Sequence, residues 1–150
     1  MQSAETHAVK VLNSLIETTL DSANGYREAA ENINMPDCKA QFAQRATERS
    51  ELARRLQDEV RSFGGEPEDD QSLVGKLHNK FVDLKNAVTG NSDKAVIDEV
   101  ERGEDVIKGK YEAATQDEDL PQRAQVLVQQ AYASIKADHD DVSRLKHSLQ

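Results

Sequence analysis

The spacing of apolar residues near the start of the chain limits the possible folds more than any other feature of the sequence. Between residues 9 and 33, apolar or small residues recur at alternating intervals of three and four. Residues with this spacing lie on one face of a helix, so the segment predicts a long helix with a bundle seam. The seam consists of Val9, Leu12, Ile16, Thr19, Ala23, Tyr26, Ala30 and Ile33.

Four further segments carry helical spacing, and turn residues separate them. Pro36 ends the first helix near residue 34, because a residue before proline avoids helical geometry, and Asp37 is expected to cap the second helix. Gly64, Gly65 and Pro67 form a stop signal after the second helix. We therefore predict helices over residues 5–33, 38–63, 72–88, 93–116 and 121–148.

The lengths of these segments and of their connections predict a topology. The loops after the first and the fourth helix are short, so each of these helices forms an antiparallel hairpin with the next long helix. The third helix is shorter and lies in the connection between the two hairpins, where it is expected to serve as a crossover. A length of 150 residues suits one domain, so we expect residues 1–150 to form a single all-α four-helix bundle.

Short motifs, occurring in order along nearly the whole chain, resemble a known family. They are Leu12 to Glu17, Gly25 to Glu31, Gly64-Gly65-Glu66-Pro67, Glu101 to Asp105, Asp119-Leu120-Pro121 and His139-Asp140. With these motifs the chain is similar to the bacterial family catalogued as domain of unknown function 2383. The resemblance implies a ferritin-like fold, in which two antiparallel hairpins are joined by a crossover with a short helix. It implies no activity.

Composition and charge exclude several classes of partner. The formal net charge of -9 repels polyanions, so nucleic acid is an unfavourable partner. No stretch approaches the roughly 18 apolar residues of a membrane span, and residues 1–10 lack the layout of a signal peptide. Cys38 is the single cysteine, which excludes an internal disulfide. We expect an acidic cytoplasmic protein without membrane insertion.

The sequence lacks the motif that ferritin-like di-iron proteins use for metal. Those proteins take a glutamate from each of two helices and a Glu-x-x-His motif from each of the other two. None of the four histidines has a glutamate three positions earlier, so the Glu-x-x-His motif is absent. The nearest substitute is Glu48-x-x-Glu51, a pair typical of a solvated helix face. We therefore expect no metal cofactor. The histidines are His7, His78, His139 and His147.

The heptad phase instead predicts charged side chains inside the bundle. Arg45 and Arg49 fall on the apolar face of the second helix, and Glu104 falls in the seam of the fourth. If these two helices run parallel, Arg49 lies level with Glu104, and Arg45 with Glu101. An ion pair of this kind would satisfy two desolvated groups where relatives carry metal. The alternative is that rotation of the bundle lets the arginines reach solvent. The predicted buried polar layer comprises Arg45, Arg49, Glu101, Glu104, Tyr26 and His139.

These observations favour a non-enzymatic ferritin-like module that acts by assembly or by binding a protein partner, with a homodimer as one form of self-association. We find no catalytic triad and no glycine-rich phosphate loop. One alternative is a variant di-iron or di-manganese protein that handles iron or peroxide. A weaker alternative is a small-molecule or lipid binder whose cavity lies under the crossover, walled by Leu77, Phe81 and Leu84. The metal ligands of the first alternative would be Glu48, Glu51, Glu101, Glu104 and His139.

Overall fold

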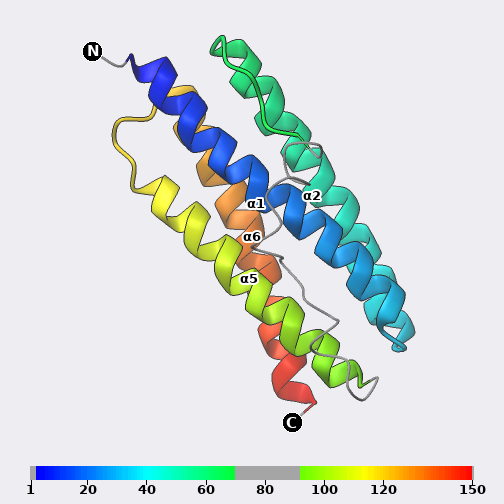
Figure 1. Cartoon of the computed structure of the whole chain (residues 1–150). Helices are drawn as coiled ribbons and strands as arrows, with labels where there is room; N and C mark the ends of the chain where they lie inside the picture. Colours follow the sequence, from blue (N-terminus) through cyan, green and yellow to red (C-terminus); the bar gives the residue numbers. More distant parts are fainter. Residues whose placement is uncertain (1–2, 70–91, 150) are drawn as a thin grey trace.

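The computed structural model describes residues 3–69 and 92–149, in which the secondary structure is entirely helical. Helix α1 spans Ala4–Asn32, α2 spans Pro36–Ser62, α5 spans Asp93–Thr115 and α6 spans Gln122–Ser148 (Figure 1). The all-α prediction is confirmed, and these four helices begin and end within two residues of the predicted positions. The crossover helix predicted at residues 72–88 lies outside the described residues.

Local chemistry explains where the helices begin. Ser3 and Ser92 cap α1 and α5, and each hydroxyl accepts a hydrogen bond from a backbone N–H three residues later, which would otherwise be unsatisfied. Helix α2 begins with Pro36, whose missing N–H costs nothing at the first helical position. The expectation that Asp37 caps this helix is wrong: Met35 occupies the cap position, and Asp37 lies in the first turn, where its charge complements the helix dipole.

The helices form two antiparallel hairpins, α1 with α2 and α5 with α6. Helix α1 packs against α5 and thereby joins the hairpins. Figure 1 shows that α2 and α5 run in the same direction, with α1 and α6 between them. Helices α2 and α5 are therefore diagonal neighbours, and only long side chains can connect them across the bundle centre.

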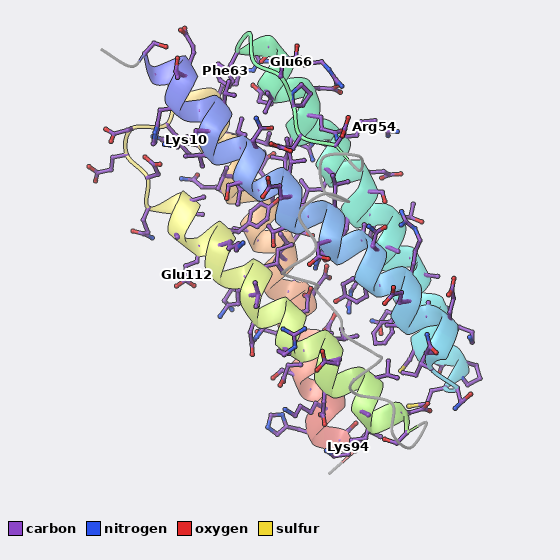
Figure 2. All side chains as sticks on the ribbon, in the orientation of Figure 1. Lys10, Arg54, Phe63, Glu66, Lys94 and Glu112 are labelled. Carbon is purple, nitrogen blue, oxygen red and sulfur yellow. The ribbon has the colours of Figure 1, made fainter. Side chains whose placement is uncertain are left out.

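The core is apolar except at its middle. The rings of Tyr26 and Phe42 lie 5.5 Å apart between α1 and α2. Figure 2 shows side chains filling the space between the ribbons. None of the four described helices combines the length and apolar character needed to cross a membrane. The largest fully enclosed side chains are Tyr26, Tyr111, Phe42, Leu12, Ile16, Ile33, Leu56, Ile97, Ile107, Ile135, Glu104 and Val60.

After α2 the chain turns back along the first hairpin. Gly64 has a φ of 82°, a left-handed conformation that glycine adopts without strain. The side-chain amide of Asn13 then holds the returning segment: its nitrogen donates to the Glu66 carbonyl at 3.0 Å, and its oxygen accepts from the Glu68 N–H at 2.8 Å. The Asn13 amide thus pairs with one backbone carbonyl and one backbone N–H of this segment, as the backbone of a neighbouring strand does.

We expect Gly65→Ala to destabilise the protein, because the turn presses this residue against the hairpin. A Cβ atom here would lie 2.6 Å from both γ-methyl groups of Val9 and 3.1 Å from Val60 Cγ1. Valine is stiff at χ1, so the clash requires a backbone shift that costs roughly 1–3 kcal/mol.

The matched control is Gly109→Ala, at an exposed position away from the ends of α5, where the added methyl group meets nothing within 4 Å. This change should stabilise the protein by up to about 1 kcal/mol through helix propensity. Urea unfolding measures both variants, and equal effects would contradict the proposed close approach.

Candidate functional site

Arg49, in the middle of α2, bonds to side chains from all three other described helices. Its Nη1 donates to Ser22 Oγ on α1 and to Glu104 Oε1 on α5, both at 2.7 Å. Its Nη2 donates to Glu104 Oε2 at 3.1 Å and to Asp138 Oδ2 on α6 at 3.0 Å. Arg49 and Glu104 are 2% and 0% exposed. A two-point pair of this kind matches the planar guanidinium to the carboxylate.

Arg45, one turn earlier on α2, extends the network toward α6. Its Nε lies 3.3 Å from Asp138 Oδ1, and its Nη2 donates to Asp141 Oδ2 at 3.2 Å. Each carboxylate oxygen of Asp138 therefore faces a different arginine. The side chain of Asp141 is 43% exposed, so the network begins at the bundle centre and ends at the surface along α6.

The two guanidinium groups flank the ring of Tyr26. Their central carbons lie 5.9 Å (Arg45) and 5.3 Å (Arg49) from the ring centroid, within cation–π range. Burial, followed by the charge of Glu104, raises the pKa of Tyr26 well above its usual value, although the charges of Arg49 and Arg45 act in the opposite direction. Tyr26 is therefore neutral at physiological pH.

The arginines stay charged despite their burial. Desolvation is the largest single effect on Arg49 and lowers its pKa, but the charge and hydrogen bond of Glu104, together with the effects of Tyr26 and Asp138, raise the net pKa above the usual value. For Arg45, burial also lowers the pKa, while Tyr26 and then Asp138 raise it to a net value above normal. The charges of Asp138 and Glu104 act against the desolvation of both cations.

A second buried polar contact lies near this layer. Tyr111 Oη is 2.7 Å from Thr19 Oγ1, and the Thr19 hydroxyl donates to the Leu15 carbonyl at 2.6 Å. Because a threonine hydroxyl has a single proton, Tyr111 must donate to Thr19. Burial raises the pKa of Tyr111, so this donor keeps its proton.

Two members of the predicted layer lie elsewhere. Glu101 is one turn from Glu104 and faces the last turns of α6, where Lys146 Nζ donates to it at 2.8 Å and Ser143 Oγ at 3.1 Å. The hydrogen bond from Lys146 lowers the pKa of Glu101. Placing Glu101 beside Arg45 was therefore wrong, because the side chain turns outward to these partners.

Placing His139 in the buried layer was also wrong. Neighbouring helical positions differ by about 100° in direction, and Asp138 is the one that faces inward. His139 instead lies 2.6 Å from Asp105 through Nε2 and 3.2 Å from Asp140 through Nδ1. Partial burial lowers the pKa of His139, but these two carboxylates raise it above its usual value.

The alternative in which the arginines reach solvent is also wrong, since Arg45 and Arg49 are both buried. Three side chains completed the layer without being predicted: Ser22, Asp138 and Asp141. The sequence held a signal for Asp138, an acid in the apolar stripe of α6 between Ile135 and Val142.

A di-metal centre does not fit this arrangement. Glu104 is the only fully buried carboxylate among residues 3–69 and 92–149, and the Arg49 guanidinium engages both of its oxygens. Glu48 and Glu51 are exposed on α2 and point away from the layer. An always-charged cation in contact with the central carboxylate disfavours a divalent ion at the same place.

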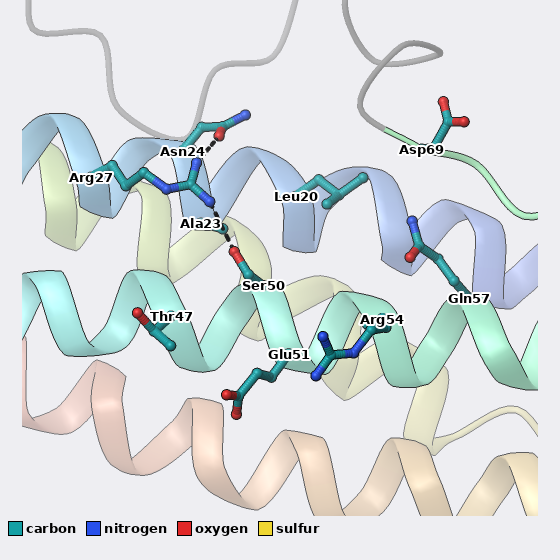
Figure 3. Close-up of a pocket in the computed structure, with 10 residues that line it drawn as sticks. All are labelled: Leu20, Ala23, Asn24, Arg27, Thr47, Ser50, Glu51, Arg54, Gln57 and Asp69. Atoms are coloured by element: carbon teal, nitrogen blue, oxygen red, sulfur yellow. Dashed lines mark hydrogen bonds between the residues drawn. The ribbon is translucent and has the colours of Figure 1, made fainter.

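A groove on the outer side of the first hairpin has a volume of about 440 Å³. Figure 3 shows Arg27 of α1 turned toward Asn24 and Ser50, and the Arg27–Ser50 hydrogen bond, at 2.9 Å, bridges α1 and α2. Charged side chains of both signs line the groove, including Arg54 and Glu51. The proposed lipid-binding wall, Leu77, Phe81 and Leu84, lies outside the described residues.

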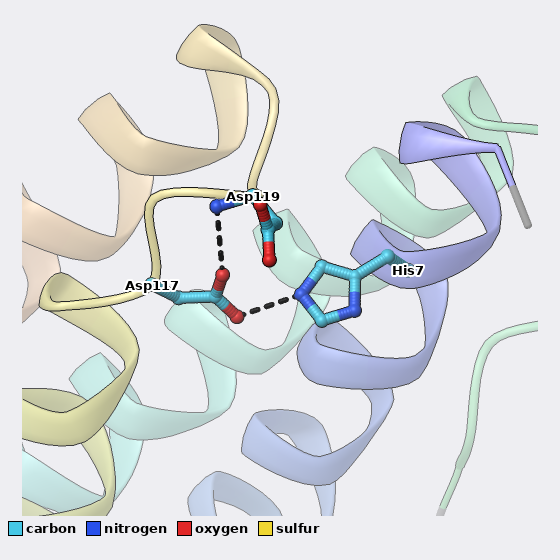
Figure 4. A group of neighbouring side chains, drawn as sticks. All are labelled: His7, Asp117 and Asp119. Atoms are coloured by element: carbon cyan, nitrogen blue, oxygen red, sulfur yellow. Dashed lines mark hydrogen bonds and ion pairs between the residues drawn. The ribbon is translucent and has the colours of Figure 1, made fainter.

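A separate cluster of one histidine and two aspartates lies at the end of the bundle where α1 begins. His7 Nε2 is 2.7 Å from Asp117 Oδ2, in the loop between α5 and α6. The carboxylate of Asp119 faces the same space (Figure 4), and one ligand atom from each of the three residues lies within 4.8 Å of the others.

The chain is similar to one protein family and to a solved structure. The model of the family described as Domain of unknown function (DUF2383) matches residues 7–117. The fold is similar to the solved structure of a Mycobacterium smegmatis Dps1 mutant, with a TM-score of 0.81 and 11% sequence identity over 95% of this chain and 97% of that chain. No curated protein matches the sequence. The structural likeness shows the ferritin-like four-helix fold.

Proposed function

Since this chain belongs to the DUF2383 family, whose description assigns no function, we propose a function from its own core: a non-enzymatic ferritin-like module that acts by assembly or by binding a protein partner. In this proposal the Arg45–Arg49 layer stands where di-iron bundles hold their metals. The observation that carries the proposal is the contact of Arg49 with both oxygens of Glu104.

The contacts of the carboxylates in the layer support this proposal. A bundle metal site needs deprotonated ligands that converge on an empty space. Here the central carboxylate already has a cation 2.7 Å away, and Asp138 accepts from the same cation at 3.0 Å. A metal ion at Glu104 would have to displace a buried guanidinium that cannot lose its proton, and that cation would lose its two-point contact with the carboxylate.

The neutral side chains near the layer support it as well. Burial raises the pKa of both Tyr26 and Tyr111 above the usual value, so neither supplies a phenolate ligand at physiological pH. The net charge of -9 disfavours a polyanionic partner. We therefore propose a second copy of the chain or another protein as the partner, and light scattering of the purified protein distinguishes these two cases.

We expect protein purified without chelator and passed through gel filtration to hold substoichiometric iron and manganese, and to show no saturable iron oxidation. Elemental analysis and an absorbance assay of Fe²⁺ oxidation measure these two properties. Glu104→Gln and Glu28→Gln are a matched pair, since the first changes the buried layer and the second an exposed position on α1. Iron oxidation that Glu104→Gln abolishes and Glu28→Gln preserves would support the di-iron alternative and overturn the proposal.

A further inference from the structure

We propose that His7, Asp117 and Asp119 form a binding site for one divalent transition-metal ion at the end of the bundle. The inference goes beyond the proposed function, because this site shares no residue with the Arg49 layer. It rests on the convergence of an imidazole nitrogen and two carboxylates from segments far apart in the sequence.

The three donor atoms are close to the spacing that one ion requires. Two ligands about 2.1 Å from one ion can lie at most about 4.2 Å apart. His7 Nε2 and Asp117 Oδ2 are 2.7 Å apart, and all three donor atoms lie within 4.8 Å of one another. Small side-chain rotations would therefore bring Asp119 into coordination. The ion would replace the direct contact between His7 Nε2 and Asp117 Oδ2.

The backbone holds both sides of the site in place. His7 lies at the end of the first turn of α1, a regular helix capped by Ser3. Asp117 is fixed by its N–H, which donates to the Ala114 carbonyl at 3.2 Å, and the loop is anchored by Leu120, which is buried in the core. The cost of assembling the ligands is low when they are held on rigid elements.

His139 provides an internal comparison that shows why the arrangement at His7 is different. It also has two carboxylate neighbours, but Asp105 meets Nε2 and Asp140 meets Nδ1. Ligands on opposite nitrogens of one ring cannot share an ion. At His7, in contrast, both carboxylates face the same space beside the ring (Figure 4).

The donor set indicates the class of ion. A nitrogen ligand with two carboxylates suits zinc, whereas calcium and magnesium prefer oxygen ligands alone. Asp119 is exposed, so water can complete the coordination sphere. The bound ion would tie the start of α1 to the α5–α6 loop. Without the ion, the His7–Asp117 contact joins these two segments.

Calorimetric titration of the full chain with Zn²⁺ tests the site. Wild type should bind one ion, and His7→Gln and Asp119→Asn should each weaken binding at least about tenfold. His7→Gln can keep a hydrogen bond to Asp117, and Asp119 is exposed, so both variants are expected to fold; circular dichroism checks this. His139→Gln is the matched control and should bind Zn²⁺ as wild type does.

A second measurement identifies the ligand directly. In NMR spectra of the histidine rings, Zn²⁺ should shift the nitrogen signals of His7 first and leave those of His139 unchanged at equimolar metal. The proposal is overturned if millimolar Zn²⁺ gives no saturable binding, or if folded His7→Gln and Asp119→Asn bind as wild type does. The zinc experiments test His7 and Asp119, whereas the iron oxidation assay tests Glu104. The proposed metal site and the proposed function can therefore fail separately.

Discussion

Replacing Glu104 with alanine should lower the free energy of unfolding by about 3 kcal/mol or more. The change leaves the guanidinium of Arg49 buried without its two-point partner, and breaking a buried pair in this way costs roughly 3–5 kcal/mol. Asp138, 3.0 Å from the same guanidinium, remains as a partial substitute, which places the expected loss near the lower end of that range. Urea unfolding followed by circular dichroism measures it.

Glu48→Ala is the control for this experiment. Glu48 lies one residue before Arg49 on the same helix, but its side chain is exposed. Surface changes of this kind usually alter stability by less than about 0.5 kcal/mol. If the two glutamate variants lose similar small amounts of stability, the buried layer does not contribute as its geometry indicates.

Arg49→Met should be about as damaging as Glu104→Ala, yet combining it with Glu104→Leu should restore much of the loss. The single change leaves a fully enclosed carboxylate without its cation. The double change replaces the pair by apolar side chains of similar size, which is often close to neutral. Recovery should be incomplete, because Ser22 loses its donor and Asp138 keeps only Arg45 as a cation.

A double-mutant cycle over Arg49→Met, Glu104→Leu and the double variant isolates the contribution of the pair. We expect a coupling energy of roughly 2 kcal/mol or more between positions 49 and 104. Additive losses, with the double variant as unstable as the sum of the two single variants, would show that the two side chains do not depend on each other.

Much of the fold could be predicted from the sequence, because its signals are local. Ser92 marks the start of α5 through its capping hydroxyl, and Gly64 and Gly65 mark the end of α2. The heptad phase also indicated that Arg49 and Glu104 point inward, since both lie in apolar stripes near the middle of long helices. Periodicity determines which face a residue occupies, so these predictions needed no long-range information.

The remaining partners in the layer depend on distances that a sequence pattern does not contain. Counting residues from the turn of each hairpin estimates the position of a residue along the bundle axis. The count does not tell which side chain spans the distance between α2 and α6. Arg45 was expected beside Glu101, and it instead reaches Asp138 and Asp141. The assignment of His139 failed for a related reason, because a one-residue difference in phase decides between the core and the surface.

The cluster at His7 could not be predicted from periodicity at all. Its contact with Asp117 joins residues that are 110 positions apart. Asp117 and Asp119 lie in a loop, and their direction depends on hydrogen bonds such as the one from the Asp119 N–H to Asp117 Oδ1 at 3.0 Å. Loop conformations of this kind follow from packing and not from the spacing of residue types.

The connection of Arg49 to three other helices affects how the protein can open. If α1, α5 or α6 detached alone, the guanidinium would lose a partner while the rest of the layer stayed buried. Partial opening at the bundle centre therefore carries much of the free-energy cost of complete unfolding. Helix ends can fray independently, but we expect the amide hydrogens of the central turns to exchange only when the whole bundle comes apart.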